Sequence, residues 1–475
     1  MQDLTQGSIP RHIARLSVPI AVGMVFQTLY FLVDLYFVGQ LGDTAIAGLS
    51  AAGNLQFLIM AITQVLGVGT MALIAQASGR KDRADANLVF NQSLGLAALG
   101  AALTLGLGYG LARPYMRTLG ADDAIVDGGV LYLHWFLPGL ALQFALISMG
   151  SALRGTGVVN PTIVVQVATV VLNAILSPIT IAGWLTGRPF GLLGAGLSTS
   201  ISVAVAVVLM TVYFVRLERF VVFDRSLIRP RWSAWRRVLE VGLPPGGEFA
   251  LLFVYMGTVL WVIRGFGPEA QAGFGVGSRI MQALFLPAMA IAFATAPVAG
   301  QNMGAGRADR VRATYRTAVV TLSGIMLGLT AFCQWQPALL ISGFSDEEPV
   351  IAVGAEFLRI ISFNFLATGV VFTNSSMFQA MGNTMPALQA SALRILLFAV
   401  PAVWMTMVSA FELRHLWYLS AVTVALQAMF SYWLLMREYE HRLGDLRPPE
   451  AAASSPPGVA EAASPGNEDL PATRG

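Results

Sequence analysis

The stretch from residue 27 to residue 42, QTLYFLVDLYFVGQLG, places one carboxylate, Asp34, in a run that is otherwise mostly apolar or aromatic. The apolar run begins at Ile13, so it has more than the roughly 20 residues that a membrane-spanning helix needs. A charge at the centre of such a helix costs about 2.5 to 3.5 kcal/mol on insertion scales, and it is kept mainly for function. Asp34 is therefore the first candidate for a functional site.

The composition supports a membrane location. Of 475 residues, 56% are hydrophobic and 12% are charged, with a mean hydropathy of +0.67, whereas soluble domains carry about 25% charged residues. The one cysteine, Cys333, excludes a disulfide framework and a multi-cysteine metal cluster. The one lysine, Lys81, lacks a glycine-rich P-loop around it, so the chain cannot form a Walker A motif, and its energy must come from an ion gradient or from a partner chain. The net charge of +3 requires no nucleic-acid partner.

The hydropathy pattern predicts an all-α polytopic membrane protein. Most of the 29 Lys and Arg residues fall in loops on one side, and this asymmetry predicts that both termini are cytoplasmic in a multi-pass protein of the cell inner (plasma) membrane. The twelve predicted spans lie near residues 13–38, 45–76, 87–112, 129–152, 160–183, 190–215, 240–263, 270–300, 315–341, 351–380, 386–410 and 413–437.

An internal repeat divides the chain into two halves. A shift of 225 residues aligns Pro19 with Pro244 and QASG (76–79) with QNMG (301–304). Each half has an even number of spans, so the repeat is parallel, as in many secondary transporters. The predicted parts are a cytoplasmic N-terminal segment (1–12), an N-lobe (13–215), a basic linker (216–239), a C-lobe (240–437) and a disordered cytoplasmic tail (438–475).

Transport driven by an ion gradient needs a group that binds a proton or a cation inside the membrane. Gln27, Tyr30 and Asp34 share one face of the first predicted helix. The second in-span acid is Glu248, which shares a face with Tyr255 seven residues later. Its repeat partner is Gly23, so the two halves are chemically unequal.

Several segments resemble the multidrug and toxic compound extrusion (MATE) transporters. The segment LSVPIAVGMVFQTLYFLVDLYFVGQLG (16–42) is similar to the family's first helix, with Pro19, Gln27 and Asp34 in the family spacing. The resemblance continues in ALRGTGVVNPTIVVQVATVVLNAILSPITIAG (152–183), GLLGAGLSTSIS (191–202) and FQAMGNTMPAL (378–388). It implies two homologous six-helix bundles around a V-shaped central cleft, and export of cationic, aromatic drugs in exchange for sodium or protons.

The resemblance also implies an ion site in the N-lobe, formed by Asp34, Asn173, Ser177 and Thr199, while Glu248 matches a C-lobe carboxylate of one branch. Many relatives have an aspartate or asparagine where this chain has Ser177, a weaker ligand for sodium. We therefore favour proton coupling, and sodium coupling stays open, with Asp34, Asn173 and Thr199 as its metal ligands.

For the substrate we expect cation–π and dispersion contacts with an organic cation, in a lipid-embedded monomer that needs no cofactor beyond H⁺ or Na⁺. The candidate substrate-binding residues are Gln27, Tyr30, Tyr255, Met256 and Phe285.

Three other functions remain as alternatives. A flippase for lipid-linked precursors would need a strongly cationic cavity, but the in-span arginines are only Arg279, Arg359 and Arg394. An intramembrane enzyme would need a catalytic motif, and the spans hold no HExxH motif or closely spaced aspartate pair, so we expect a transporter and not an enzyme. A channel is the third alternative.

Overall fold

The computed structural model describes residues 1–119, 122–185, 187–408 and 410–444, except for the side chains of Tyr30, Phe31, Asp34, Leu35, Asp43, Thr44 and Ala51. The prediction of a disordered tail from residue 438 is wrong for its first residues, because helix α14 continues to Leu443; from position 445 onward the tail lies outside the described residues. The described residues form helices and no strands. The α-helices are α1 Ile9–Gly39, α2 Asp43–Gly79, α3 Arg83–Leu119, α4 Asp123–Gly155, α5 Asn160–Ile181, α6 Leu192–Arg216, α7 Trp232–Ile263, α8 Pro268–Gly304, α9 Ala308–Trp335, α10 Pro337–Ser342, α11 Glu348–Ile361, α12 Asn364–Met381, α13 Met385–Met405 and α14 Leu413–Leu443.

The predicted number of spans is confirmed. Within the described residues, 11 helices are long and apolar enough to cross a membrane, or 12 if α11 and α12 form one span with a bend of 56°. This pair corresponds to the predicted span 351–380, which is therefore broken. Two side chains of α9 satisfy carbonyl groups at the break: Thr330 donates to the Ser362 carbonyl at 2.8 Å, and Gln334 donates to the Arg359 carbonyl at 2.6 Å. Such partners allow a helix to break inside a membrane.

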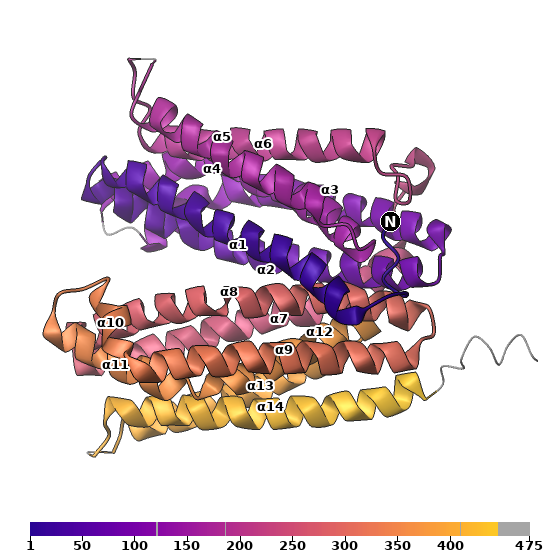
Figure 1. Ribbon diagram of the computed structural model, residues 1–475. Coiled ribbons are helices and arrows are strands. Elements are labelled where there is room, and N and C mark those ends of the chain that lie inside the picture. The colour runs from indigo at the N-terminus through magenta and orange to yellow at the C-terminus, as the bar shows by residue number, and fades with distance from the viewer. Residues whose placement is uncertain (120–121, 186, 409, 445–475) are drawn as a thin grey trace, which may run out of the picture.

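The helices form two lobes that lie side by side with roughly parallel long axes (Figure 1). The first lobe contains α1 to α6 and the second contains α7 to α14. We call the end that holds the N-terminus the N-terminal end. The connections 80–82, 156–159, 217–231, 305–307 and 382–384 lie there, whereas the connections 40–42, 264–267 and 343–347 lie at the opposite end.

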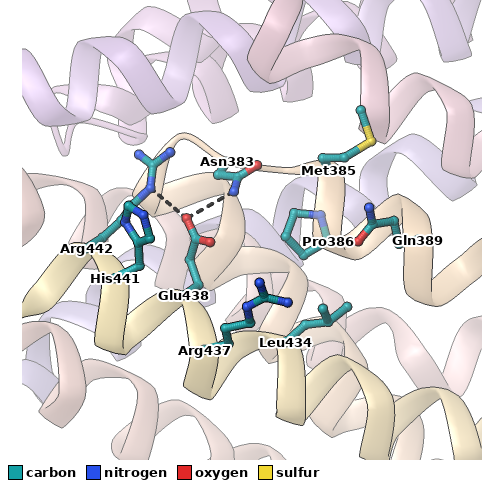
Figure 2. A pocket seen from close by; sticks show the side chains of 9 residues that line it. All are labelled: Asn383, Met385, Pro386, Gln389, Leu434, Arg437, Glu438, His441 and Arg442. Carbon is teal, nitrogen blue, oxygen red and sulfur yellow. Dashed lines mark hydrogen bonds and ion pairs between the residues drawn. The ribbon is translucent and has the colours of Figure 1, made fainter.

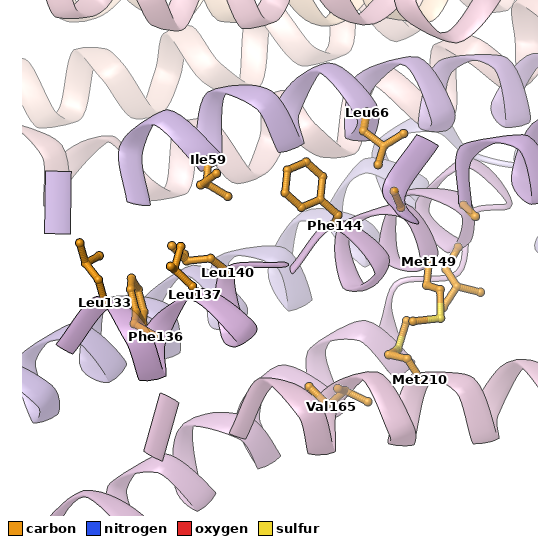
Figure 3. Packing of buried hydrophobic residues seen from close by; sticks show 14 of the residues in the cluster. Ile59, Leu66, Leu133, Phe136, Leu137, Leu140, Phe144, Met149, Val165 and Met210 are labelled. Atoms are coloured by element: carbon orange, nitrogen blue, oxygen red, sulfur yellow. The ribbon is translucent and has the colours of Figure 1, made fainter. Parts of the chain in front are cut away.

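Close packing of side chains against glycine helps to hold the N-lobe together. In the N-lobe, Ile59 and Leu66 of α2 belong to the same buried cluster as Phe144 of α4 (Figure 3). Glycine on α3 gives Phe144 its space, because a Cβ atom at Gly100 would lie 2.6 Å from the phenylalanine ring. Small residues at helix contacts are the usual basis of packing in membranes, where burial from water provides little driving force between helices.

Candidate functional site

The two lobes contact each other backbone to backbone at the N-terminal end. A Cβ atom at Gly79 of α2 would lie 1.9 Å from the carbonyl oxygen of Gln301 in α8. In the reciprocal contact, a Cβ atom at Gly304 of α8 would lie 2.0 Å from the carbonyl oxygen of Gln76 in α2. Residues 76 and 79 are the repeat partners of residues 301 and 304. The contact therefore has an approximate two-fold symmetry, and neither glycine has room for a side chain.

Two glutamines extend this symmetric contact. The amide of Gln76 donates to the Ala380 carbonyl of the other lobe at 2.8 Å, and the amide of Gln301 donates to the Gly155 carbonyl at 3.0 Å. Both acceptors lie in the last residues of a helix, where carbonyl groups have no partner within the helix. Each lobe thus caps a helix of the other lobe at the N-terminal end.

The N-terminal segment lies across this contact and binds to both lobes. We call residues 2–7 the N-terminal strap. The amide of Gln2 donates to the Thr156 carbonyl of the N-lobe at 2.8 Å, and the amide of Leu4 donates to the side-chain oxygen of Gln301 at 2.9 Å. Arg307 donates to the Thr5 carbonyl at 2.8 Å, and the Leu4 side chain is fully buried. The strap therefore adds to the closure of the N-terminal end.

The lobes separate toward the opposite end. Phe57 of α2 and Phe253 of α7 meet across the lobes with ring centroids 6.0 Å apart. One helical turn nearer the opposite end on the same faces lie Gly53 and Gly257. Within the described part of the chain, a Cβ atom at either glycine would meet no neighbour within 4 Å. The space between the lobes therefore widens from the Phe57 contact toward the opposite end, as expected for a V-shaped cleft.

The N-lobe contains a buried polar cluster between α5 and α6. Asn173, Ser177, Ser198 and Thr199 are all buried. The Ser177 hydroxyl lies 3.4 Å from the side-chain oxygen of Asn173 and 3.5 Å from the Ser198 hydroxyl. The two helices approach closely because a Cβ atom at Gly194 would lie only 2.3 Å from the Thr180 carbonyl. The structure thus brings Asn173 and Ser177 together on α5, and Thr199 is buried on α6 next in the chain to Ser198, which contacts Ser177.

Asp34 and Tyr30 lie in α1, but their side chains are outside the described residues. The backbone still indicates the depth of position 34. Helices α1 and α5 both start at the N-terminal end. They contact each other at Gly23 of α1 and Gln166 of α5, because a Cβ atom at Gly23 would lie 2.7 Å from the side-chain oxygen of Gln166. Residues 34 and 177 each follow this contact by 11 residues, so they lie at a similar depth.

Glu248 lies within the C-lobe, between α7 and α13. Its Oε2 accepts a long hydrogen bond of 3.4 Å from the Ser391 hydroxyl, which in turn accepts one of 3.2 Å from the Gln427 amide of α14. Its Oε1 is buried and accepts no hydrogen bond from any described residue. An ionised Glu248 is costly in that position, because burial of an unpaired charge is unfavourable. Uptake of a proton or binding of a cation would remove this cost.

A second group of polar side chains lies one to two turns from Glu248, on the same three helices. The guanidinium of Arg394 sits over the Tyr255 ring at 4.6 Å from its centroid, and the Tyr255 hydroxyl lies 3.0 Å from the Ser420 hydroxyl. The sequence interpretation missed Ser391, Arg394, Ser420 and Gln427 as neighbours of Glu248 and Tyr255. One signal was available: Ser420 and Gln427 are seven residues apart in α14, the same spacing as Glu248 and Tyr255 in α7.

The candidate substrate residues occupy different environments. Gln27 is exposed on α1. Met256 and Tyr255 are partly buried and pack against the apolar core of the C-lobe. Phe285 does so as well, with its ring 4.9 Å from that of Phe365 between centroids. Tyr255, Met256 and Phe285 thus belong to one lobe, and Gln27 belongs to the other.

A comparison with known families identifies the fold. The family model MatE matches residues 19–179 and again residues 244–405. The chain belongs to the MATE family. The second match begins 225 residues after the first, which is the shift of the internal repeat. As a MATE protein, the chain is a multi-pass membrane transporter and not an enzyme.

Curated relatives of this MATE protein carry names of transporters. The probable multidrug resistance protein YpnP of Bacillus subtilis is 25% identical over 80% of this chain and 84% of its own length. The multidrug export protein MepA of Staphylococcus saprophyticus is 23% identical over 79% and 83%. The FAD transporter of Shewanella oneidensis is 23% identical over 84% and 88%. Two of these three relatives are named for multidrug resistance or export, and the third is named for transport of FAD.

Solved structures agree with the fold. A transporter of the MOP superfamily from Pyrococcus furiosus, described as having a reversed polarity of its binding pocket, is 25% identical, with a TM-score of 0.82 over 93% of this chain and 98% of that chain. A MATE structure in a bent conformation has a TM-score of 0.86 at 24% identity, over 95% of this chain and 98% of that chain. The arrangement of two six-span lobes is therefore shared with known MATE proteins.

Proposed function

We propose that the protein is a secondary active efflux antiporter that exports organic cations in exchange for protons, or for sodium, by alternating access. The observation that carries this proposal is the pair of lobes joined at the N-terminal end and parted beyond Phe57 and Phe253. A single site between such lobes can open to one side at a time. With most basic residues at the N-terminal end, we place this end in the cytoplasm and the protein in the cell inner membrane.

Asp34 is the proposed coupling group of the N-lobe, with Asn173, Ser177 and Thr199 as its neighbours. The similar depth of positions 34 and 177 supports this grouping. Side-chain oxygens of these types fit either a proton or a sodium ion. A serine is a shorter and weaker ligand than the acid or amide common at this position, so we favour the proton.

Glu248 is the proposed second ion-responsive group. Its partly unpaired carboxylate lies inside the C-lobe, where a proton or a cation would neutralise it. Tyr255, a candidate for substrate binding, is on the same face of α7 and already has Arg394 over its ring. We therefore place Glu248 in ion coupling and leave cation binding by Tyr255 to conformations in which Arg394 moves away.

The proposed substrates are cationic and aromatic. Gln27, Met256 and Phe285 provide one amide and two polarizable or aromatic surfaces, which bind flat cations with little selectivity. Relatives named for multidrug export support this class, whereas the relative named as an FAD transporter makes an anionic aromatic substrate the main competing class. We propose that the transporting unit is a monomer in the lipid bilayer.

The flippase alternative is disfavoured by the placement of the in-span arginines. Arg394 stacks on Tyr255 inside the C-lobe, and Arg359 lines a small cavity of about 290 Å³ beside α10 and α14. Within the described residues, Arg394 and Arg359 are thus held in two different places and do not line one cavity together. A lipid pyrophosphate would need such a cluster.

The function is tested by dye efflux from proteoliposomes that contain the purified protein. A proton gradient alone and a sodium gradient alone are imposed in turn, with a cationic aromatic dye and with FAD as substrates. The proposal predicts saturable dye transport that depends on one of the two gradients. Flux that is independent of both gradients, or transport of FAD alone, would overturn it.

Replacement of Glu248 by glutamine should lower gradient-driven dye efflux about tenfold while dye binding persists. The amide has the shape of the protonated acid but releases no proton, so a step that needs release is blocked. The measurement is initial efflux rate against pH, with Glu248→Asp expected to restore part of the rate and its pH dependence. The control is Glu240→Gln, which removes only an exposed ion pair with Arg236. Unchanged efflux in Glu248→Gln would contradict a coupling role.

Introduction of a charge into the strap should open the N-terminal end. Leu4→Asp buries a carboxylate where the leucine is fully buried, so the strap is expected to detach. A reporter cysteine, Ala75→Cys, faces Gly300 across the lobes, and its reaction with a water-soluble maleimide should become at least about tenfold faster. The control is Leu185→Asp, because Leu185 is 94% exposed at the opposite end. Equal labelling rates in both variants would show that the strap has no part in closure.

Closure of the N-terminal end by the strap should not depend on pH in the neutral range. The Thr5 hydroxyl donates to the Asp3 carboxylate at 2.6 Å, and this hydrogen bond holds the pKa of Asp3 below its usual value of 3.8. A carboxyl group whose pKa is lowered in the folded protein contributes stability at pH values above its ordinary pKa. This contribution is lost only as the pH falls through the lowered pKa. The Asp3 turn is therefore fully charged at the pH values used for transport.

A further inference from the structure

A groove on the C-lobe belongs to neither the cleft nor the Glu248 cluster. It lies at the N-terminal end, between the first residues of α13 and the last turns of α14 (Figure 2). Its volume is about 460 Å³. Asn383, Met385 and Pro386 line one side, and Leu434, Arg437 and His441 line the other.

The charge of the groove is unbalanced. The charge of Glu438 is balanced by Arg442, which lies 2.6 Å from its Oε1, and the amide of Asn383 donates to the same oxygen at 3.0 Å (Figure 2). Arg442 also donates to the Met381 carbonyl at 2.8 Å. Arg437, by contrast, forms no ion pair with any carboxylate of the described residues. The groove therefore presents one uncompensated guanidinium to a ligand.

An apolar surface continues from this guanidinium toward the middle of the protein. Met429, Trp433 and Arg437 follow one another at four-residue intervals on α14, so they share a face. Met429 is 61% exposed and Trp433 is 54% exposed, and the Arg437 guanidinium lies 5.9 Å from the Trp433 ring centroid. In a membrane-spanning helix, exposed side chains of this kind contact acyl chains, and an arginine near the helix end reaches the headgroup level.

We propose that this groove binds the phosphate of an anionic phospholipid, with one acyl chain along Met429 and Trp433. A guanidinium pairs with phosphate in a bidentate manner, and the neighbouring amide of Asn383 and imidazole of His441 supply further polar contacts at the same mouth. A free phosphate has no apolar part that could contact the surface of Met429 and Trp433, so this surface favours a lipid over a free phosphate. The groove with Arg437 and the apolar surface of Met429 and Trp433 beside it thus account for the two parts of the ligand.

The experiment compares phosphatidylglycerol with phosphatidylcholine of the same acyl chains, bound to the purified full chain in detergent and counted by native mass spectrometry. Glycerol 3-phosphate is the arm that represents the headgroup without its chains. We expect phosphatidylglycerol to be retained in preference to the zwitterionic lipid, and Arg437→Gln to lower its retention about fivefold. Glycerol 3-phosphate should not displace it.

The matched control is Arg316→Gln, which removes an exposed arginine of α9 near the same end but outside the groove. It should leave retention unchanged. Equal retention of both lipids by the unmodified protein, or equal losses in the two variants, would show a diffuse attraction to basic residues and overturn the site. Binding of glycerol 3-phosphate as strong as that of the lipid would overturn the assignment of a lipid as the ligand.

Discussion

A disulfide between positions 75 and 300 is expected to reduce transport to the background level. In the described structure a Cβ atom at Gly300 would lie 2.9 Å from the Cβ atom of Ala75, one in each lobe. A disulfide needs a Cβ separation of about 3.5 to 4.5 Å, so a shift of about half an ångström suffices. The bond would lock the N-terminal end, which must part if the substrate site is to face the other side.

The experiment uses Ala75→Cys with Gly300→Cys in a background without the native thiol, Cys333→Ala. Dye efflux is measured after oxidation and again after reduction, which should restore it. The matched control is Gly273→Cys with Val353→Cys, because those Cβ atoms would also lie 2.9 Å apart but both belong to the C-lobe. Its oxidation should leave transport largely intact. Full efflux from a quantitatively cross-linked 75–300 pair would mean that the N-terminal end never opens.

Asp34→Asn is expected to abolish gradient-driven efflux while the protein still folds and binds dye. Asparagine keeps the size of the side chain but cannot exchange a proton, and it is a weaker ligand for sodium. Antiport requires each ligand to lower the affinity for the other by the same factor. In the unmodified protein, dye affinity should therefore change with pH or sodium, and in Asp34→Asn only the part of this dependence that Glu248 contributes should remain.

Dye binding at several pH values and sodium concentrations, together with efflux rates, checks this expectation. The control is Asp127→Asn, which removes an exposed aspartate paired with Arg113 near the opposite end. That variant should behave like the unmodified protein. If Asp34→Asn transports normally and keeps its ion dependence, coupling rests elsewhere, and Glu248 becomes the leading candidate.

Coupling to one proton supplies enough free energy for useful efflux. One elementary charge contributes about 2.3 kcal/mol per 100 mV, and each pH unit contributes about 1.4 kcal/mol. A tenfold substrate gradient requires about 1.4 kcal/mol. One or two protons per cycle would therefore sustain gradients of tenfold to thousandfold, without any nucleotide site.

The ion-site prediction shows how far a sequence can be interpreted. Asn173, Ser177 and Thr199 were placed together by a family resemblance; all three are buried, and Ser177 lies 3.4 Å from Asn173, while their role in ion coupling stays a prediction. Glu248 was found because a charge in an apolar span is conspicuous. Its partners Ser391 and Gln427 were not found, because serine and glutamine occur in many spans for local reasons and gain meaning only from the helix that faces them.

The sequence by itself determined the spans, the repeat and the side on which the basic residues lie. Each of these depends on local hydropathy and on the order of residues, since a helix in lipid must satisfy its own backbone. The tertiary structure alone decided that Gly79 and Gly304 meet the opposite lobe, that Gln76 and Gln301 cap helices of the other lobe, and that the strap seals this contact. Those features depend on distances between residues far apart in the chain, and many glycines and glutamines of the same sequence face no such neighbour.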